Sequence, residues 1–395
     1  MNLTQHSRLS LITLQIYQDM KHYIVEDCVS GEFFEMPQIC VEAIELLRAG
    51  ETLGAVEERL KQKYPAEEVD LLDFAQQLID LQLVATIDGE NIARVTKTST
   101  PKGYQWIPPK LGKFFFNPTA YFVYVGLFIG NFVLFYFQPS LFPTYKDLFI
   151  FDYMFLNILA WMLLSVITVL IHEFGHVLAM RAYQLPTKLE IGHRLFLVVF
   201  ETDMSAIWKL PAKNRNVLYL AGLCFDTVIL FFALIGQLLF SGNSNIVVGL
   251  LNIIVLDTFI RMVYQCCIYM KTDLYHVFEN TSGCYNLMEN AQQLLNKWLP
   301  LRRRTAQGEV TYAEERRIVF VYSIFYLTGM TLTVLLFAAY YIPQLFFAVK
   351  KVAPGFSQGV ASVPFWDAVL FTSQIFIIIV LLLYSWRKKY FMKQV

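Results

Sequence analysis

Two histidines and a glutamate interrupt an apolar stretch in the middle of the chain, in the run His172-Glu173-Phe174-Gly175-His176. Residues four apart lie on one face of a helix, so the imidazoles of His172 and His176 can hold one Zn²⁺. Glu173 stands one residue along and can reach a water on that ion as a general base. Acidic and imidazole groups are costly inside a membrane, so their presence there indicates a function. The pattern predicts metalloprotease chemistry, with a structural polar cluster as the alternative.

A zinc ion needs a third protein ligand besides the two histidines. The candidates near the other apolar runs are Asp203, Asp226, Asp257, Asp273, His193 and His276. Asp257 precedes Arg261 by four residues, so an ion pair on one helix explains it. Asp273 is expected at the cytoplasmic end of the fourth apolar helix, at a depth comparable to that of His176. Asp273 is therefore our choice, and a solvated carboxylate at a helix end is the alternative.

The composition is that of a polytopic membrane protein with a soluble part attached. Of its 395 residues, 56% are hydrophobic and 16% are charged, and the mean hydropathy is +0.46. The formal net charge of zero hides an asymmetry, because residues 1–100 carry 17 acidic side chains against 8 basic ones. The surplus of negative charge opposes nucleic-acid binding, which depends on the neutralisation of phosphates by Lys and Arg.

Six apolar runs follow a linker at 98–113, and each is long enough to cross about 30 Å of hydrocarbon. They lie at about 119–138, 152–182, 217–240, 246–270, 317–342 and 366–386. Basic clusters around Lys110, Lys209, Arg303 and Lys388 fall on one side if the helices alternate in direction. That side is expected to be cytoplasmic, so both termini are expected in the cytoplasm. The sequence predicts a mostly α polytopic membrane domain of about six transmembrane helices over 114–395.

Residues 1–97 are expected to form a small α+β cytosolic domain. A strand at 32–36 is followed by helical patterns at 39–47, 52–64 and 69–81, and then by a β-hairpin with its turn at Asp88-Gly89. Three helices followed by a hairpin form a winged-helix arrangement. The negative charge of this domain opposes DNA binding. It favours a peptide as the ligand, which would bind by adding a strand to a sheet edge. A purely structural cap is the alternative.

A strand pattern lies between the second and third apolar runs. The alternating residues are Leu189, Ile191, His193, Leu195, Leu197 and Val199. An edge strand beside the metal would pair with the unwound backbone of a substrate. We therefore expect substrate contacts from this segment and from one acidic residue, namely His193, Leu195, Leu197, Val199 and Asp226. A connector without substrate contact is the alternative.

Residues 160–290 resemble the site-2 protease family of intramembrane zinc metalloproteases. HEFGH matches the family's catalytic motif, and the run Lys271-Thr272-Asp273-Leu274-Tyr275 is similar to its second motif, with Leu274 in place of glycine. Ala221-Gly222-Leu223 resembles the family's Ala-Gly-Pro helix start, with leucine in place of proline. The resemblance implies His172, His176 and Asp273 as zinc ligands and Glu173 as the base. It also implies a membrane-associated β-hairpin over 185–210 that holds substrate in extended form.

The run from Phe33 through Val84 resembles the leader-binding domain of the PqqD family, used by enzymes that modify ribosomally made peptides. Joined to such a protease, it is similar to membrane proteases of bacterial peptide-maturation clusters, in particular those beside epipeptide genes. This implies a small, modified precursor peptide as substrate, with a peptide-modifying enzyme, an ABC exporter and the lipid bilayer as partners. The alternatives are a site-2 protease that processes a transmembrane regulator and a non-catalytic peptide-binding or immunity protein. The intact Glu173 favours an enzyme.

Overall fold

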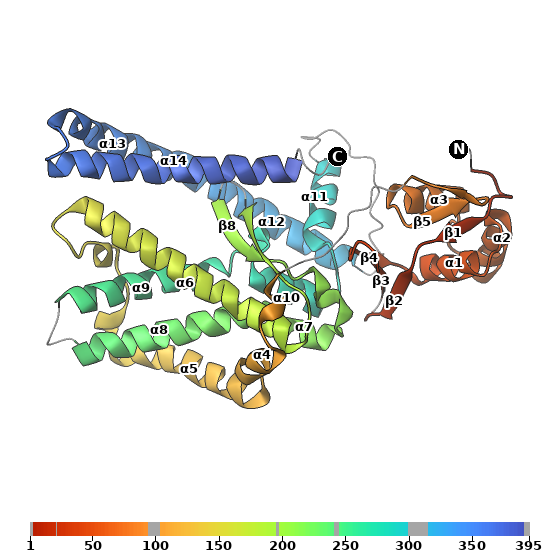
Figure 1. The fold of residues 1–395 in the computed structure, drawn as a ribbon, viewed down its shortest axis with the longest axis horizontal. Coiled ribbons are helices and arrows are strands. Elements are labelled where there is room, and N and C mark those ends of the chain that lie inside the picture. The colour runs from red at the N-terminus through yellow and green to blue at the C-terminus, as the bar shows by residue number, and fades with distance from the viewer. Residues whose placement is uncertain are drawn as a thin grey trace. The chain divides into compact units, whose positions relative to one another are not determined.

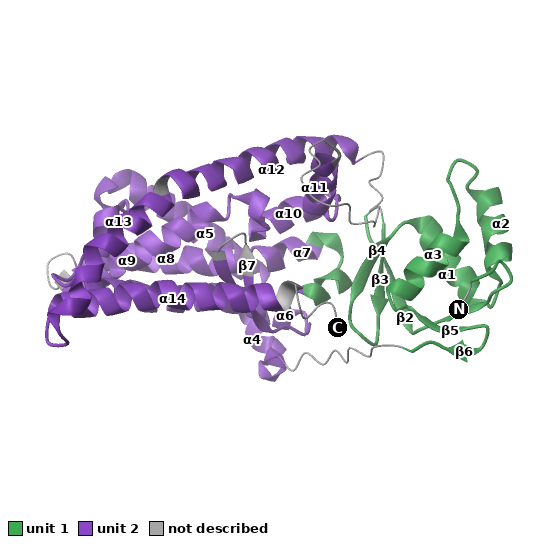
Figure 2. Cartoon of the chain, turned by 90° about the horizontal axis from the view of Figure 1, so that it is seen from above, with its two compact units in different colours: residues 1–102, 205–213 green, residues 103–204, 214–395 purple. Residues whose placement is uncertain are grey.

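The computed structural model describes residues 3–20, 22–93, 103–194, 197–240, 245–298 and 315–390. The chain forms two compact units (Figure 2). The first comprises residues 1–102 together with 205–213, and the second comprises 103–204 and 214–395. The first unit is therefore close to the domain expected over 1–97, with one later segment added to it.

The first unit is a small α+β domain. Its elements are β1 (Leu9–Leu11), β2 (Leu14–Gln18), β3 (Tyr23–Asp27), β4 (Phe33–Met36), α1 (Gln38–Arg48), α2 (Leu53–Lys63), α3 (Leu71–Asp80), β5 (Val84–Ile87) and β6 (Glu90–Asn91). Two antiparallel sheets have the orders β2-β3-β4 and β1-β5-β6. Buried side chains of all three helices and of both sheets, such as Ile44, Leu53 and Leu78, make one core.

The strand at 32–36, the three helices and the hairpin are present as predicted. Thr52 is the N-cap of α2, since its hydroxyl accepts a hydrogen bond from the Ala55 amide. Strands β1, β2 and β3 were not predicted. They are only three to five residues long. Such short strands contain too few residues for an alternating apolar pattern to be recognised in the sequence.

In the part of the second unit that the structure describes, six helices are long and apolar enough to cross a membrane, which confirms the predicted number. The helices that make up these spans are α5 (Pro118–Phe137), α6 (Met154–Ala182), α7 (Ala212–Tyr219) with α8 (Ala221–Phe240), α9 (Asn245–Tyr264), α12 (Arg316–Leu336) with α13 (Ile342–Val352), and α14 (Val363–Tyr390). The shorter elements of the unit are η1 (Tyr104–Trp106), α4 (Pro109–Phe115), η2 (Pro139–Leu141), η3 (Tyr145–Leu148), η5 (Ile268–Met270), α10 (Asp273–Ser282), α11 (Leu287–Trp298) and η7 (Ala353–Gln358).

The end of the fourth apolar helix differs from the prediction. Helix α9 ends at Tyr264, not near residue 270, and the chain then turns through η5. Lys271 has a φ of 53°, a left-handed conformation that cannot continue a helix. Thr272 then caps α10, because its hydroxyl accepts a hydrogen bond from the Tyr275 amide. Asp273 is therefore the first residue of a new helix and does not lie at the end of the fourth one.

Two other predicted boundaries are also wrong. The fifth apolar helix runs past residue 342, because a π-helical segment at Phe337–Tyr341 carries α12 directly into α13. The linker predicted at 98–113 contains helix α4 in its described part. Pro109 occupies the first turn of that helix. Backbone amides in the first turn have no acceptor within the helix, so the missing amide hydrogen of proline costs no hydrogen bond there.

Helix α6 lies at the centre of the second unit. It packs against α4, α8, α9 and α14 and against strand β8 (Figure 1). Gly175 permits the close approach of α8, since a Cβ there would lie 2.8 Å from the carbonyl oxygen of Ala221. Strands β7 (Leu189–Arg194) and β8 (Leu197–Thr202) form the β-hairpin expected over 185–210, and α14 contacts both of them. The polar residues of α6 thus lie between α8 on one side and the hairpin on another.

Candidate metal centre

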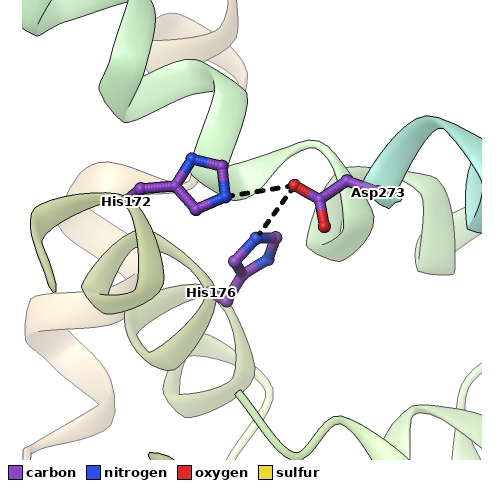
Figure 3. Close-up of side chains that lie close together, drawn as sticks. All are labelled: His172, His176 and Asp273. Atoms are coloured by element: carbon purple, nitrogen blue, oxygen red, sulfur yellow. Dashed lines mark ion pairs between the residues drawn. The ribbon is translucent and has the colours of Figure 1, made fainter. Parts of the chain in front are cut away.

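His172 and His176 of α6 meet Asp273 at the start of α10 (Figure 3). Asp273 Oδ2 lies 3.2 Å from His172 Nε2 and 3.3 Å from His176 Nε2. Ligand atoms at about 2.0–2.1 Å from a tetrahedral zinc ion lie about 3.3 Å from one another. All three side chains are buried. These three residues therefore have the spacing and burial of a metal-binding group.

The second nitrogen of each imidazole is fixed by an acceptor. His172 Nδ1 lies 2.8 Å from Asp226 Oδ2, and His176 Nδ1 lies 2.9 Å from the carbonyl oxygen of Leu218. Both acceptors are on the helices α7 and α8 that pack beside α6. A proton on each Nδ1 leaves the Nε2 lone pair directed toward the centre, the orientation that metal-ligating histidines usually show.

Asp226 belongs to a buried network of charges. Its carboxylate is fully buried and accepts hydrogen bonds from the Arg261 guanidinium at 2.9–3.1 Å. Arg261 also pairs with Asp257 at 2.9 Å, as the spacing of four residues predicted. The hydroxyls of Ser165 and Thr168 on α6 donate to Asp257. Because a buried charge is stable only when it is paired, Arg261 permits an ionised Asp226 behind His172.

Gln265 positions Asp273. The Asp273 amide donates to Gln265 Oε1 at 2.9 Å, and Gln265 Nε2 donates to Asp273 Oδ2 at 3.0 Å. Burial opposes ionisation of Asp273, but the imidazoles of His176 and His172 outweigh it and hold the pKa of this carboxyl well below its usual range.

Glu173 is buried and held by the hairpin. Thr202, the last residue of β8, donates its hydroxyl hydrogen to Glu173 Oε2 at 2.7 Å. A carboxylate has two oxygens, so Oε1 can accept a second proton donor, such as a water. The hairpin therefore orients the one acidic group that lies beside the two histidines in the sequence.

Gly222, the second residue of α8, faces the histidines. A Cβ at this position would lie 2.4 Å from His172 Nε2 and 2.6 Å from His176 Nε2. Such separations are far below van der Waals contact, so only glycine fits here without displacing the two imidazoles. Gly222 thus lets α8 pack directly against the rings that carry the two Nε2 atoms.

The other candidates lie outside this group. Asp203 pairs with Lys188 at 3.9 Å, and His276 stacks on Tyr219 and pairs with Glu279 at 3.4 Å. Val199 pairs with Gly192 across the hairpin. Leu195 lies outside the described residues, as do the side chains of His193 and Leu197. Substrate contacts from these residues and from Asp226 stay a prediction.

Sequence reasoning missed Thr202, Gln265 and Gly222 as parts of the site. Thr202 and Gln265 are ordinary polar residues with no spacing relation to the motif. Gly222 carried a signal, because it stands in the helix-start motif Ala221-Gly222-Leu223. No protein-family profile, curated protein or solved structure matches this chain.

Proposed function

We propose that this chain is an intramembrane zinc metalloprotease of the site-2 type. The observation that carries the proposal is the spacing of 3.2 and 3.3 Å between the carboxylate oxygen and the two imidazole nitrogens. The two histidines lie inside an apolar helix and have a buried glutamate beside them. The HEFGH run and the run around Asp273 resemble the two motifs of that family, which supports the same reading.

Zinc suits the donor set. Two imidazole nitrogens and one carboxylate oxygen form the three-ligand pattern of catalytic zinc sites, which keep a fourth position open. Gly222 lets α8 pack beside both rings without displacing their Nε2 atoms from this arrangement. A zinc ion bound there supplies Lewis acidity, which lowers the pKa of water and polarises a carbonyl group.

The chain's own residues would then move the protons. Glu173 accepts a proton from the attacking water through Oε1 while Thr202 holds Oε2, and it passes that proton to the leaving amine. Asp226 keeps the Nδ1 proton on His172, so Nε2 stays available as a ligand atom. Burial of the group in apolar surroundings excludes bulk water and strengthens each of these electrostatic interactions.

A small ribosomally made precursor peptide is the substrate we propose. A peptide bond inside a helix is shielded, so the substrate must be unwound, and an edge of the β7-β8 hairpin can pair with an extended segment. The three helices and hairpin of the first unit support a winged-helix, PqqD-like fold for it. The outer strands β2 and β4 of its β2-β3-β4 sheet would be the edges for a leader peptide. The basic loops support a cytoplasmic side for both termini, in a bacterial cell membrane.

Glu173→Gln separates an enzyme from a binding protein. The amide keeps the size and the hydrogen bond to Thr202 but cannot take a proton. Mass spectrometry should follow cleavage of precursor peptides, encoded beside the gene, by the detergent-purified protein. The variant should retain zinc and bind precursor while product release falls at least about 100-fold, the scale of a lost general base.

His172→Ala is the matched control, because it should lose the zinc as well as the activity. Normal peptide maturation by the Glu173→Gln variant would show that the chain acts by binding alone. Removal of residues 1–97 tests the first unit separately. The truncated chain should keep its zinc but process the precursor poorly, and unchanged cleavage would rule out a substrate-receptor role for this unit.

A further inference from the structure

A pocket of about 360 Å³ opens beside the Glu173 side chain. Its walls are apolar side chains of α6, including Leu170 and Phe174, together with Leu189 of β7 and Tyr104 of η1. Glu173 is the one charged residue of the lining. The pocket is thus an apolar space with the proposed catalytic base in its wall.

Helix geometry explains why one glutamate belongs to both the pocket and the metal centre. Successive residues of an α-helix are rotated by about 100°. The α6 residues of the lining, among them Leu170 and Phe174, fall on one side of Glu173, and His172 and His176 fall on the other. The Glu173 carboxylate lies between the two faces. A group bound at the metal centre therefore has the apolar pocket next to it, across Glu173.

The neighbouring strand indicates what the pocket takes. Among the described residues β7 forms a ladder with β8 alone, and its Leu189 lines the pocket. An extended peptide that adds to β7 would therefore run beside Leu189. Side chains of an extended peptide alternate in direction, so one points toward Leu189 while its backbone follows the strand. The volume is at the small end of the range for ligand pockets, about 300–1,000 Å³. It suits one large apolar side chain with part of its backbone.

We infer that this pocket is the subsite for a large aliphatic or aromatic side chain next to the scissile bond. The inference rests on the proposed protease function and adds the substrate class that the site selects. Binding of that side chain would bring the adjacent carbonyl across Glu173 to the metal centre. The continuity of the pocket with Glu173 favours a substrate side chain over a lipid chain as its occupant.

Two metal-directed probes test the subsite without a known substrate. Acetohydroxamate and 4-methylpentanohydroxamate carry the same chelating group, but only the second carries a branched alkyl chain. Titration calorimetry on the zinc-loaded full chain in one detergent should give at least tenfold tighter binding of the second probe. Burial of each additional methylene should tighten binding about fourfold, so four carbons suffice for this preference.

Leu170→Trp should fill the pocket and remove the preference, while acetohydroxamate binds as in the unchanged protein. Leu163→Trp is the matched control, because Leu163 is an exposed leucine two turns earlier on the same face of α6 and outside the lining. It should leave both affinities unchanged. Phe174→Ala widens the pocket, so it should bind a phenyl-bearing hydroxamate more tightly than 4-methylpentanohydroxamate. This variant serves as a second test if Leu170→Trp does not fold.

The possible results distinguish failure of the proposed subsite from failure of the proposed protease function. If zinc and acetohydroxamate bind but the alkyl chain adds no affinity, the subsite is refuted and the metal centre stands. If the preference persists in Leu170→Trp, the chain is held by detergent or by another surface, and the inference is again overturned. If the protein takes up no zinc, the proposed function fails and the subsite fails with it.

Discussion

The substitution Gly222→Ala should empty the metal centre without touching a ligand. The new Cβ would lie 2.4 Å from His172 Nε2 and 2.6 Å from His176 Nε2. Ordinary contacts between such atoms are about 3.5 Å, so each nitrogen would have to retreat by about 1 Å. Zinc ligand distances tolerate deviations of about 0.2 Å. The displacement required of each Nε2 atom is therefore several times larger than the deviation that zinc coordination tolerates.

Loss of the contacts that orient metal ligands typically costs about 10–100-fold in metal affinity, and here both ligand nitrogens would move, so zinc affinity should fall by about 100-fold. This loss corresponds to about 2.7 kcal/mol. Competition with a chelator of known affinity, followed by metal analysis of the purified protein, measures it directly. The fold should survive, since Ala is a better helix former than Gly by about 1 kcal/mol.

Gly126→Ala is the matched control for this experiment. Gly126 also lies in an apolar helix, but a Cβ there would meet no atom within 4 Å. The zinc content of this variant should equal that of the unchanged protein, and its thermal stability should be at least as high, because alanine is the better helix former. If Gly222→Ala binds zinc within threefold of the unchanged protein, the ion does not sit beside Gly222, and the assignment of the centre is wrong.

Substitutions at three further residues test the ligand set and the contacts around it. Asp273→Asn should weaken zinc binding and abolish cleavage, because a neutral amide is a poor zinc ligand; wild-type activity would move the role to another carboxylate. Asp226→Asn should lower zinc affinity by about 10–100-fold, since Arg261 and the Nδ1 proton of His172 lose a charged partner, and chelator competition would show it. Thr202→Val should keep the zinc and reduce precursor turnover by about tenfold. Thr202→Ser should restore turnover, and equal rates for the two Thr202 variants would contradict the role of the hydroxyl.

The sequence alone determines the elements and the reactive motif. Long apolar runs predict six helices because the hydrocarbon thickness fixes the number of residues needed. His172, Glu173 and His176 fall within five residues of one helix, so their mutual placement follows from the helical period alone. The helices and hairpin of the first unit are also local patterns with recognisable caps and turns, such as Thr52 and Asp88-Gly89.

The tertiary structure alone decides which distant residues join the motif. The spacing to Arg261 accounts for Asp257, but no local pattern shows that Asp273 rather than Asp226 lies against the two Nε2 atoms. Asp273 reaches the histidines because the chain leaves α9 at Tyr264, turns through a left-handed residue and starts α10 at the centre. This turn directs the Asp273 carboxylate toward the histidines. If α9 had continued as a helix through residue 273, the carboxylate would have pointed elsewhere.

The roles of Gly222 and Thr202 likewise depend on close packing between separate elements. Glycine is needed at position 222 because α8 approaches within contact distance of both imidazoles. Thr202 acts on Glu173 because the hairpin packs against α6. Such contacts join residues that are 29 to 54 positions apart. Side-chain packing in three dimensions sets those contacts, and the periodicity of a single helix or strand contains no information about them.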